Sequence, residues 1–280
     1  MLKVGVIQLN TGNDVGSAVD TAVAYIRAVA ADGATFISTP ETTHLMEMDR
    51  AAVLRKASHE DADKGLKRFR ALAVELGVWL HIGSLIIKVA EEKLANRGFL
   101  IGPDGEIEAR YDKLHLFDVD LPNGETYRES RLYQPGENAV LAQTPFGQLG
   151  MTICYDLRFP YLYRQLAVAG ANILLVPAAF TEKTGEAHWH TLLQARAIET
   201  GCFVIAAAQT GLHDTGRKTF GHSLIIDPWG TILVDGGVNP GAYVTQLDLA
   251  KVAQTRQTMP SLSHGRDIRV TVSRGGVGTK

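Results

Sequence analysis

Three side chains of this sequence could together perform nucleophilic chemistry: a thiol, a carboxylate and an amine. Cys154 ends an apolar, strand-like run and precedes a helical pattern. At such a strand-to-helix junction its sulfur would point away from the end of the sheet, beside exposed backbone N–H groups. These groups favour the thiolate and can stabilise an oxyanion. Glu41 follows a β-rich run, and Lys113 ends a hairpin-like region. A carboxylate can take the thiol proton and return it to a leaving group, while an ammonium holds the negative charge that develops.

The elements that must position these residues alternate between strand and helix. Apolar runs predict strands at 3–9, 34–39, 79–88, 97–102, 106–111, 172–177, 202–209, 221–227, 231–235 and 242–248. Helical spacing predicts helices at 17–31, 63–76, 159–169 and 187–200. Each reactive residue then follows the carboxyl end of a strand, where open α/β sheets collect their active sites. No repeat and no linker interrupts the chain, so we expect one α/β domain with helices outside packed sheets.

The composition narrows the class of protein. A chain of 280 residues and 30.3 kDa suits a single α/β enzyme. Hydrophobic residues make up 45% and charged residues 21%, which argues against disorder. A net charge of −2 gives no electrostatic reason to expect nucleic acid or an acidic membrane as a partner. The sequence contains neither an apolar run of about 20 residues nor a secretory signal pattern, so we expect a cytoplasmic protein.

Other chemistry-bearing residues fit structural roles. Cys202 begins a continuous apolar run and is interpreted as a core residue, and the two cysteines suggest no disulfide framework. His188 and His190 look like a metal-binding pair, but no Cys, Asp or third His stands at a suitable spacing, so we expect no metal. Arg196 and Glu199 are three positions apart on a predicted helix and are interpreted as an ion pair.

Three local sequences carry a family resemblance. They are Pro40-Glu41, Lys113-Leu114-His115-Leu116-Phe117-Asp118 and Cys154-Tyr155-Asp156-Leu157-Arg158-Phe159-Pro160. In this order they resemble the nitrilase superfamily of carbon–nitrogen hydrolases, which use a Glu-Lys-Cys triad. The resemblance extends from residue 4 to about 248. Stretches 184–189, 195–199, 221–223 and 227–230 are most similar to the branch that contains deaminated glutathione amidase, with the ω-amidases as close relatives.

The resemblance implies a fold and an assembly. The family fold is a single-domain, four-layer αββα sandwich of two mixed β-sheets. It implies a carbon–nitrogen hydrolase domain at 1–250 and a C-terminal tail at 251–280 that lies at a dimer interface. A homodimer or higher homo-oligomer is therefore expected, with a small-molecule amide substrate, no cofactor and no metal.

The resemblance also implies roles for single residues beside the catalytic Glu41, Lys113 and Cys154. Glu129 matches a further acidic residue that positions the lysine or orients the substrate, with Glu125 as a nearby competitor. The backbone N–H of Tyr155 would donate to the oxyanion.

The substrate pocket is less closely defined by the sequence. Arg158 could brace the turn by pairing with Asp156 or could face a substrate carboxylate. Phe180 and Thr181 follow another predicted strand end, in a segment that lines the acyl pocket of relatives.

The expected activity is hydrolysis of a linear amide through a Cys thioester. The branch favours the ω-amide of a 2-oxo dicarboxylic acid such as deaminated glutathione, with α-ketoglutaramate, a nitrile or an N-carbamoyl compound as alternatives. Basic partners for a substrate carboxylate are available at Arg158, Lys183, Arg196, Arg217 and Lys218. Two alternative functions belong to other classes of protein. One is a redox-sensing thiol protein, which would require a resolving cysteine near Cys154, and the other is an inactive assembly module.

Overall fold

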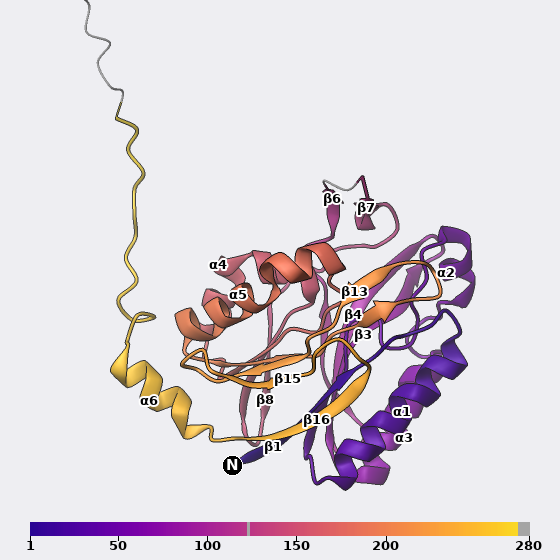
Figure 1. Cartoon of the computed structure of the whole chain (residues 1–280), viewed down its shortest axis with the longest axis horizontal. Coiled ribbons are helices and arrows are strands. Elements are labelled where there is room, and N and C mark those ends of the chain that lie inside the picture. Colours follow the sequence, from indigo (N-terminus) through magenta and orange to yellow (C-terminus); the bar gives the residue numbers. More distant parts are fainter. Residues whose placement is uncertain (122–123, 274–280) are drawn as a thin grey trace, which may run out of the picture.

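Two six-stranded mixed β-sheets pack face to face between two layers of helices (Figure 1). The computed structural model describes residues 1–121 and 124–273. The first sheet has the strand order β16 (Gly241–Leu247), β1 (Leu2–Gln8), β2 (Phe36–Ser38), β3 (Trp79–Ala90), β4 (Lys93–Ile101) and β5 (Ile107–Asp112). The second has the order β15 (Ile232–Asp235), β14 (Leu224–Ile226), β11 (Phe203–Ala206), β10 (Ile173–Leu175), β9 (Gly147–Met151) and β8 (Val140–Thr144). The predicted four-layer αββα fold is confirmed.

Two pairs of helices cover the outer faces of the sheets. Helices α1 (Val15–Ala31) and α3 (Lys64–Leu76) lie on the first sheet, and α4 (Pro160–Val168) and α5 (Glu182–Thr200) lie on the second (Figure 1). Local sequence fixes their ends. Asp63 caps α3 by accepting a hydrogen bond from the backbone N of Leu66, and Gly77 ends α3 in the left-handed region at φ 64°.

The central strands of the second sheet run parallel and are buried. Strand β10 pairs with β9 on one side and β11 on the other, and all three of its residues are fully buried. A parallel strand that is covered on both faces has a continuous apolar sequence. This is why β10 could be predicted from the sequence. The carboxyl ends of β9 and β10 therefore meet at one edge, above which the site is built.

The elements that the sequence did not predict are short or polar. They are α2 (Arg50–Lys56), the edge strand β8, the hairpins β6 (Asp118–Asp120)/β7 (Thr126–Arg128) and β12 (Thr210–Leu212)/β13 (Lys218–Phe220), the 3₁₀ turns Glu129–Arg131 and Cys154–Arg158, and α6 (Ala250–Thr258). Helix α5 also begins five residues earlier than predicted, after its N-cap Thr181. These segments bury few apolar residues, so they carry no strong periodicity.

The first part of the expected C-terminal tail forms α6, which packs on the body. Arg256 of α6 donates hydrogen bonds to the carbonyl oxygens of Ala171 at 2.7 Å and Thr200 at 3.1 Å. Beyond α6 the described chain runs away from the body (Figure 1), and residues 274–280 of the expected tail lie outside the described residues.

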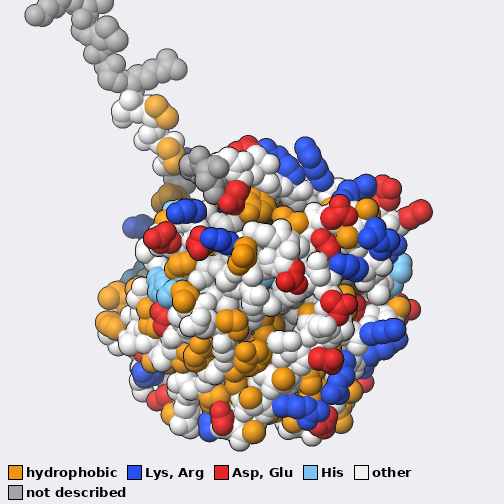
Figure 2. Space-filling view, turned by 45° about the vertical axis from the view of Figure 1, so that its right-hand side comes forward, with side chains coloured by type: hydrophobic (Ala, Val, Ile, Leu, Met, Phe, Trp, Pro, Cys, Tyr) orange, Lys and Arg blue, Asp and Glu red, His pale blue; other side chains and the backbone are white. Residues whose placement is uncertain are grey.

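The surface is of mixed charge. Acidic and basic side chains are interspersed over the face that Figure 2 shows, with apolar side chains between them. Within residues 1–121 and 124–273, every helix is too short or too polar to cross a membrane.

Candidate active site

The acid and the amine predicted from the sequence form a buried ion pair. The Nζ atom of Lys113, after β5, lies 3.0 Å from Oε1 of Glu41, after β2. The other carboxylate oxygen of Glu41, Oε2, accepts a hydrogen bond from the backbone N of Ala179 at 2.8 Å. Ala179 follows β10 of the second sheet, so the Glu41 carboxylate is fixed from both sheets.

Glu129 is the second carboxylate on the lysine. Its Oε1 and Oε2 lie 3.1 and 2.9 Å from Lys113 Nζ, and its Oε2 accepts a hydrogen bond from the backbone N of Phe117 at 2.6 Å. Glu125, the competitor for this position, instead accepts a hydrogen bond from the hydroxyl of Tyr127.

Asn96 is a site residue that the sequence analysis missed. Its Nδ2 donates to Oε1 of Glu41 at 2.8 Å and to Oε1 of Glu129 at 3.2 Å, so one amide links both carboxylates. The Asn96 side chain is buried and is separated from the buried Leu94 and Leu100 by an even number of residues, so that all three point to the same face of β4. A polar residue on the otherwise apolar face of a predicted strand was the signal that could have revealed Asn96 as a site residue.

Cys154 lies in a strained turn at the carboxyl end of β9. Its backbone φ is 51°, a left-handed conformation that costs a non-glycine residue about 1–3 kcal/mol. The turn is held because the backbone N of Cys154 donates to the carbonyl oxygen of Pro177 at 2.9 Å. The next residue, Tyr155, is near the start of the 3₁₀ turn, where backbone N–H groups lack an intrahelical acceptor.

Burial and the neighbouring charges set the protonation states of the site. Burial raises the pKa of the Cys154 thiol well above its usual value, and the adjacent Glu41 carboxylate raises it further, although Lys113 opposes this. Burial would also raise the pKa of Glu41, but the Lys113 ammonium and a hydrogen bond with Cys154 outweigh burial and lower it. Burial opposes the charge on Lys113, yet Glu129 and Glu41 hold the pKa of this amine well above its usual value. The resting arrangement is therefore a thiol beside a carboxylate, because burial outweighs the preference for thiolate that backbone N–H groups and a nearby cation give.

These residues line one cavity of about 420 Å³. Glu41, Lys113, Glu129 and Cys154 contribute to its wall, as do the other four residues predicted for the site: Tyr155, Arg158, Phe180 and Thr181. The fold thus gathers every predicted site residue at a single cavity, which also includes Asn96 and Arg217.

The basic residues proposed for a substrate carboxylate separate into two groups. Arg158 and Arg217 line the cavity, whereas Lys183 and Lys218 are exposed outside it. Arg196 is buried and donates to the carbonyl oxygen of Leu157 and to Glu199, so the predicted intrahelical ion pair is confirmed.

Arg158 does not brace the turn through Asp156. Its guanidinium carbon lies 5.3 Å from the centroid of the Phe180 ring, and its Nη atoms lie 3.4 Å from Nδ1 of His188. Asp156 instead accepts hydrogen bonds from Tyr111 and His115. The predicted pairing with Asp156 is therefore wrong, and a contact of Arg158 with a substrate carboxylate stays a prediction.

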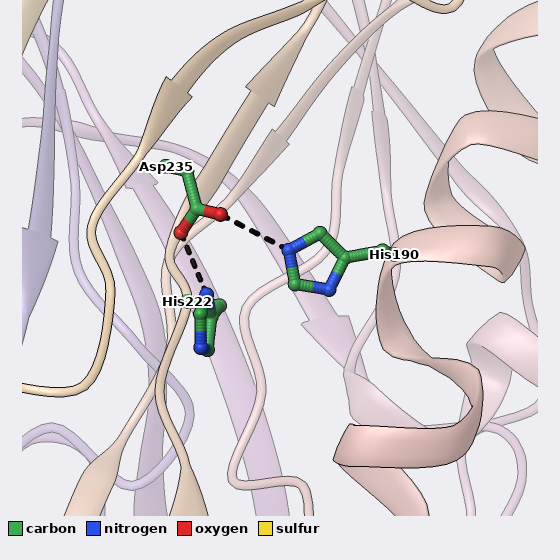
Figure 3. A group of neighbouring side chains, drawn as sticks. All are labelled: His190, His222 and Asp235. Carbon is green, nitrogen blue, oxygen red and sulfur yellow. Dashed lines mark hydrogen bonds and ion pairs between the residues drawn. The ribbon is translucent and has the colours of Figure 1, made fainter.

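The fold completes a set of potential metal ligands that sequence spacing did not reveal. His190 Nε2 lies 3.1 Å from Oδ2 of Asp235, and His222 Nδ1 lies 2.8 Å from Oδ1 of the same carboxylate (Figure 3). The three ligand atoms lie within 4.8 Å of one another. Each imidazole can donate a hydrogen bond to one oxygen of Asp235, so the three side chains meet each other's hydrogen-bonding requirements. We interpret them as a structural link between α5 and β15.

Comparison with known proteins gives the family. The sequence profile of the carbon–nitrogen hydrolases matches residues 3–257. The chain belongs to the carbon–nitrogen hydrolase family. A deaminated glutathione amidase of Yersinia enterocolitica is 43% identical over 249 residues, which cover 86% of this chain and 85% of that protein. The human deaminated glutathione amidase is 37% identical over 268 residues, which cover 94% and 82% of the two chains.

Solved structures agree with this membership. The NitFhit protein of C. elegans matches this carbon–nitrogen hydrolase with a TM-score of 0.88 and 34% identity, over 95% of this chain and 65% of that one. The expected family and reaction class are confirmed: the chain is an amidohydrolase acting on carbon–nitrogen bonds other than peptide bonds.

Proposed function

We propose that this carbon–nitrogen hydrolase cleaves the ω-amide of a 2-oxo dicarboxylic acid through a thioester on Cys154. The observation that carries the proposal is the Glu41 carboxylate, fixed between Lys113 Nζ at 3.0 Å and the Ala179 backbone N at 2.8 Å, beside the Cys154 thiol. A thiol that rests protonated needs a base at the moment of attack, and Glu41 is the base in contact with it.

Acylation transfers one proton and exchanges one bond. Glu41 takes the thiol proton as the Cys154 sulfur attacks the amide carbonyl carbon, and a tetrahedral oxyanion forms. The Lys113 ammonium and the Tyr155 backbone N–H stabilise this oxyanion. Glu41 then protonates the amide nitrogen, the C–N bond breaks, and the amine leaves the acyl group as a thioester on Cys154.

Deacylation uses the same groups in reverse order. Glu41 takes a proton from a water molecule that attacks the thioester carbonyl, and the same two donors hold the second oxyanion. The C–S bond then breaks, the sulfur recovers the proton from Glu41, and the acid product leaves. Glu129 and Asn96 act as positioning residues that hold Lys113 and Glu41 in place.

The charge of the cavity supports an anionic substrate. Six basic residues of the described chain line it, and three acidic residues do so. Arg158 next to Phe180 is suited to a carboxylate on the acyl group, while Phe180 and Thr181 form the wall of the acyl pocket. The relatives named deaminated glutathione amidase favour deaminated glutathione, in which the amide joins a 2-oxoglutaryl group to a dipeptide. The ω-amidase reaction on α-ketoglutaramate is the first alternative, because it uses the same acyl group.

The test combines activity with detection of the intermediate. Cys154→Ala should abolish hydrolysis of deaminated glutathione and of α-ketoglutaramate while leaving the unfolding transition in place. Mass spectrometry of a slow substrate should find the acyl group on the peptide that contains Cys154. Activity retained by Cys154→Ala, or an acyl adduct on Cys202, would reject the proposed nucleophile. A nitrile and an N-carbamoyl amino acid, assayed in parallel, test the remaining family activities.

A redox-sensing role is disfavoured by the burial of both thiols. Cys154 and Cys202 are free and buried, and burial raises the pKa of the Cys202 thiol as well. Redox sensors depend on accessible thiols of low pKa. We propose a cytoplasmic location, where a reducing environment keeps thiols free.

We further propose a homodimer with the C-terminal tail at its interface. Ile268, Val270 and Val272 are each at least 85% exposed in the segment that leaves the body. Apolar side chains on an extended segment gain stability when a second copy covers them. Sedimentation should give a dimer for the full chain and a weaker one after truncation beyond α6. An unchanged dimer would remove the tail from the interface.

A further inference from the structure

We infer that Arg217 binds a carboxylate carried by the leaving amine, so that the site favours amides of amino acids or short peptides. This inference rests on the proposed function and assigns Arg217 to the side of the cavity that the departing amine occupies. It separates Arg217 from Arg158, which we place at the acyl group.

Arg217 is held at the cavity by a tightly anchored loop. It lies in the turn between β12 and β13, where its carbonyl oxygen accepts a hydrogen bond from the backbone N of His213 at 2.9 Å. The His213 ring is fixed by Thr11 O at 2.9 Å and Thr219 Oγ1 at 2.7 Å. The Arg217 side chain therefore starts from a rigid base.

The guanidinium of Arg217 has no carboxylate partner among the residues that the structure describes. Its Nη2 donates to the carbonyl oxygen of Ala179 at 2.6 Å, its carbon lies 5.5 Å from the centroid of the Tyr127 ring, and its Nε makes no hydrogen bond. By contrast, Arg97 at a similar depth pairs with Asp112 and Glu60. A partly buried guanidinium that forms no ion pair, at the wall of a substrate cavity, is suited to an anionic ligand.

The position of Arg217 relative to Glu41 decides which end of the substrate it meets. Both residues bind the same peptide residue: Ala179 N donates to Glu41, and Ala179 O accepts from Arg217. The Arg217 charge also contributes to the lowered pKa of Glu41. In the proposed mechanism Glu41 hands its proton to the leaving nitrogen, so the amine must lie toward Glu41 and hence toward Arg217. The proposed function assigns Arg158, which lies against Phe180, to the acyl group instead.

A matched pair of substrates tests this assignment. The γ-amides of 2-oxoglutarate with glycine and with glycinamide share the acyl group, and their leaving amines differ by one negative charge. We expect the wild type to prefer the glycine amide in kcat/KM, and Arg217→Gln to reduce this preference by about ten- to hundredfold. The reduced preference should arise in the acylation step, because both substrates give the same thioester and therefore share the deacylation step. Arg217→Lys should restore part of the preference.

Lys218→Gln is the control, since it removes the same charge one residue away at an exposed position outside the cavity. It should keep the wild-type preference. Titration calorimetry on Cys154→Ala should show tighter binding of the glycine amide than of the glycinamide amide. This difference in affinity should shrink when Arg217→Gln is added.

An equal loss for both amides in Arg217→Gln would overturn the inference, because Arg217 would then act on Glu41 or on the acyl group. A wild type without preference for the glycine amide would overturn it too. Failure of the proposed function is recognised separately, as hydrolysis of either amide that survives Cys154→Ala.

Discussion

Asp156 holds His115 through two hydrogen bonds to a single carboxylate oxygen. Oδ1 accepts from the backbone N of His115 at 3.0 Å and lies 2.6 Å from the ring Nδ1. The other oxygen, Oδ2, accepts from the Tyr111 hydroxyl at 2.6 Å and from the backbone N of Ile153 at 2.8 Å. One buried carboxylate thus joins the segment that carries Lys113 to the turn that carries Cys154.

Asp156→Asn should therefore lower both stability and activity. The amide side chain of this variant would keep one oxygen acceptor, but its NH₂ group would face N–H and O–H groups that donate to Asp156 in the wild type. We therefore expect a loss of about 2–4 kcal/mol in the free energy of unfolding. Urea denaturation and kcat/KM measure the two effects. Asp104→Asn is the control, because this exposed carboxylate accepts a hydrogen bond from the backbone N of Glu106 away from the cavity, and its loss should cost less than about 1 kcal/mol. Equal stabilities of the two variants would contradict the bridging role of Asp156.

Asn96→Ala should move the pH dependence of catalysis. The substitution removes one of the donors that stabilise the charged form of Glu41, so the pKa of this carboxyl should rise. The acidic limb of the kcat/KM profile should then shift to higher pH, and kcat at neutral pH should fall about tenfold. Asn172→Ala, whose side chain accepts from Gln148 away from the cavity, should leave the profile in place. A lower kcat with an unshifted profile would show that Asn96 acts in some other way.

The ion pair of Glu41 and Lys113 predicts a pH window for stability. The pKa of Glu41 is lowered in the folded chain, chiefly because the Lys113 ammonium and hydrogen bonds overcome burial, so its contribution is present above the usual 4.5 and is lost as the pH falls through the lowered value. The pKa of Lys113 is raised by Glu129 and Glu41, so its contribution is present below the usual 10.5 and is lost as the pH rises through the raised value.

Urea unfolding from pH 2 to 7 checks the acidic side. The free energy of unfolding should fall more steeply below about pH 4.5 for the wild type than for Glu41→Gln. Parallel curves for the two proteins would mean that Glu41 has the same pKa in the folded and unfolded chains.

Gly83 leaves no room for a side chain at the contact between the two sheets. A Cβ atom there would lie 2.2 Å from the carbonyl oxygen of Thr39 and 2.4 Å from Cβ of Pro177. Thr39 leads to Glu41, and Pro177 O anchors Cys154, so Gly83→Ala should push the acid and the thiol apart. We expect a loss of about 1–3 kcal/mol in stability and a larger proportional loss of kcat.

Gly16→Ala provides the opposite case, because Gly16 lies in α1 and its nearest contact would be 3.4 Å away. This variant should be neutral or stabilised by up to about 1 kcal/mol. An active and stable Gly83→Ala protein would show that the two strand ends tolerate separation.

The sequence predicted the elements with strong local signals and the residues at strand ends. Helix α3 carries its own start and stop at Asp63 and Gly77, and β10 is a continuous apolar run. Spacing alone could not show that Glu41 of one sheet meets Cys154 of the other, since that contact depends on how the sheets pack; the family resemblance supplied the link. The roles of Asn96 and Ala179 depend on the same packing. The histidine cluster was missed for a related reason, because Asp235 is 45 residues away from His190.

The burial of the Cys154 sulfur limits how this enzyme can be inactivated. Ordinary alkylating reagents consume thiolates, and here the sulfur rests protonated in a residue that is 7% exposed. An electrophile must therefore enter the cavity and present its reactive carbon where Glu41 can remove the proton. Effective covalent inhibitors should be small amide mimics, chosen for shape and charge, and their intrinsic reactivity should matter less.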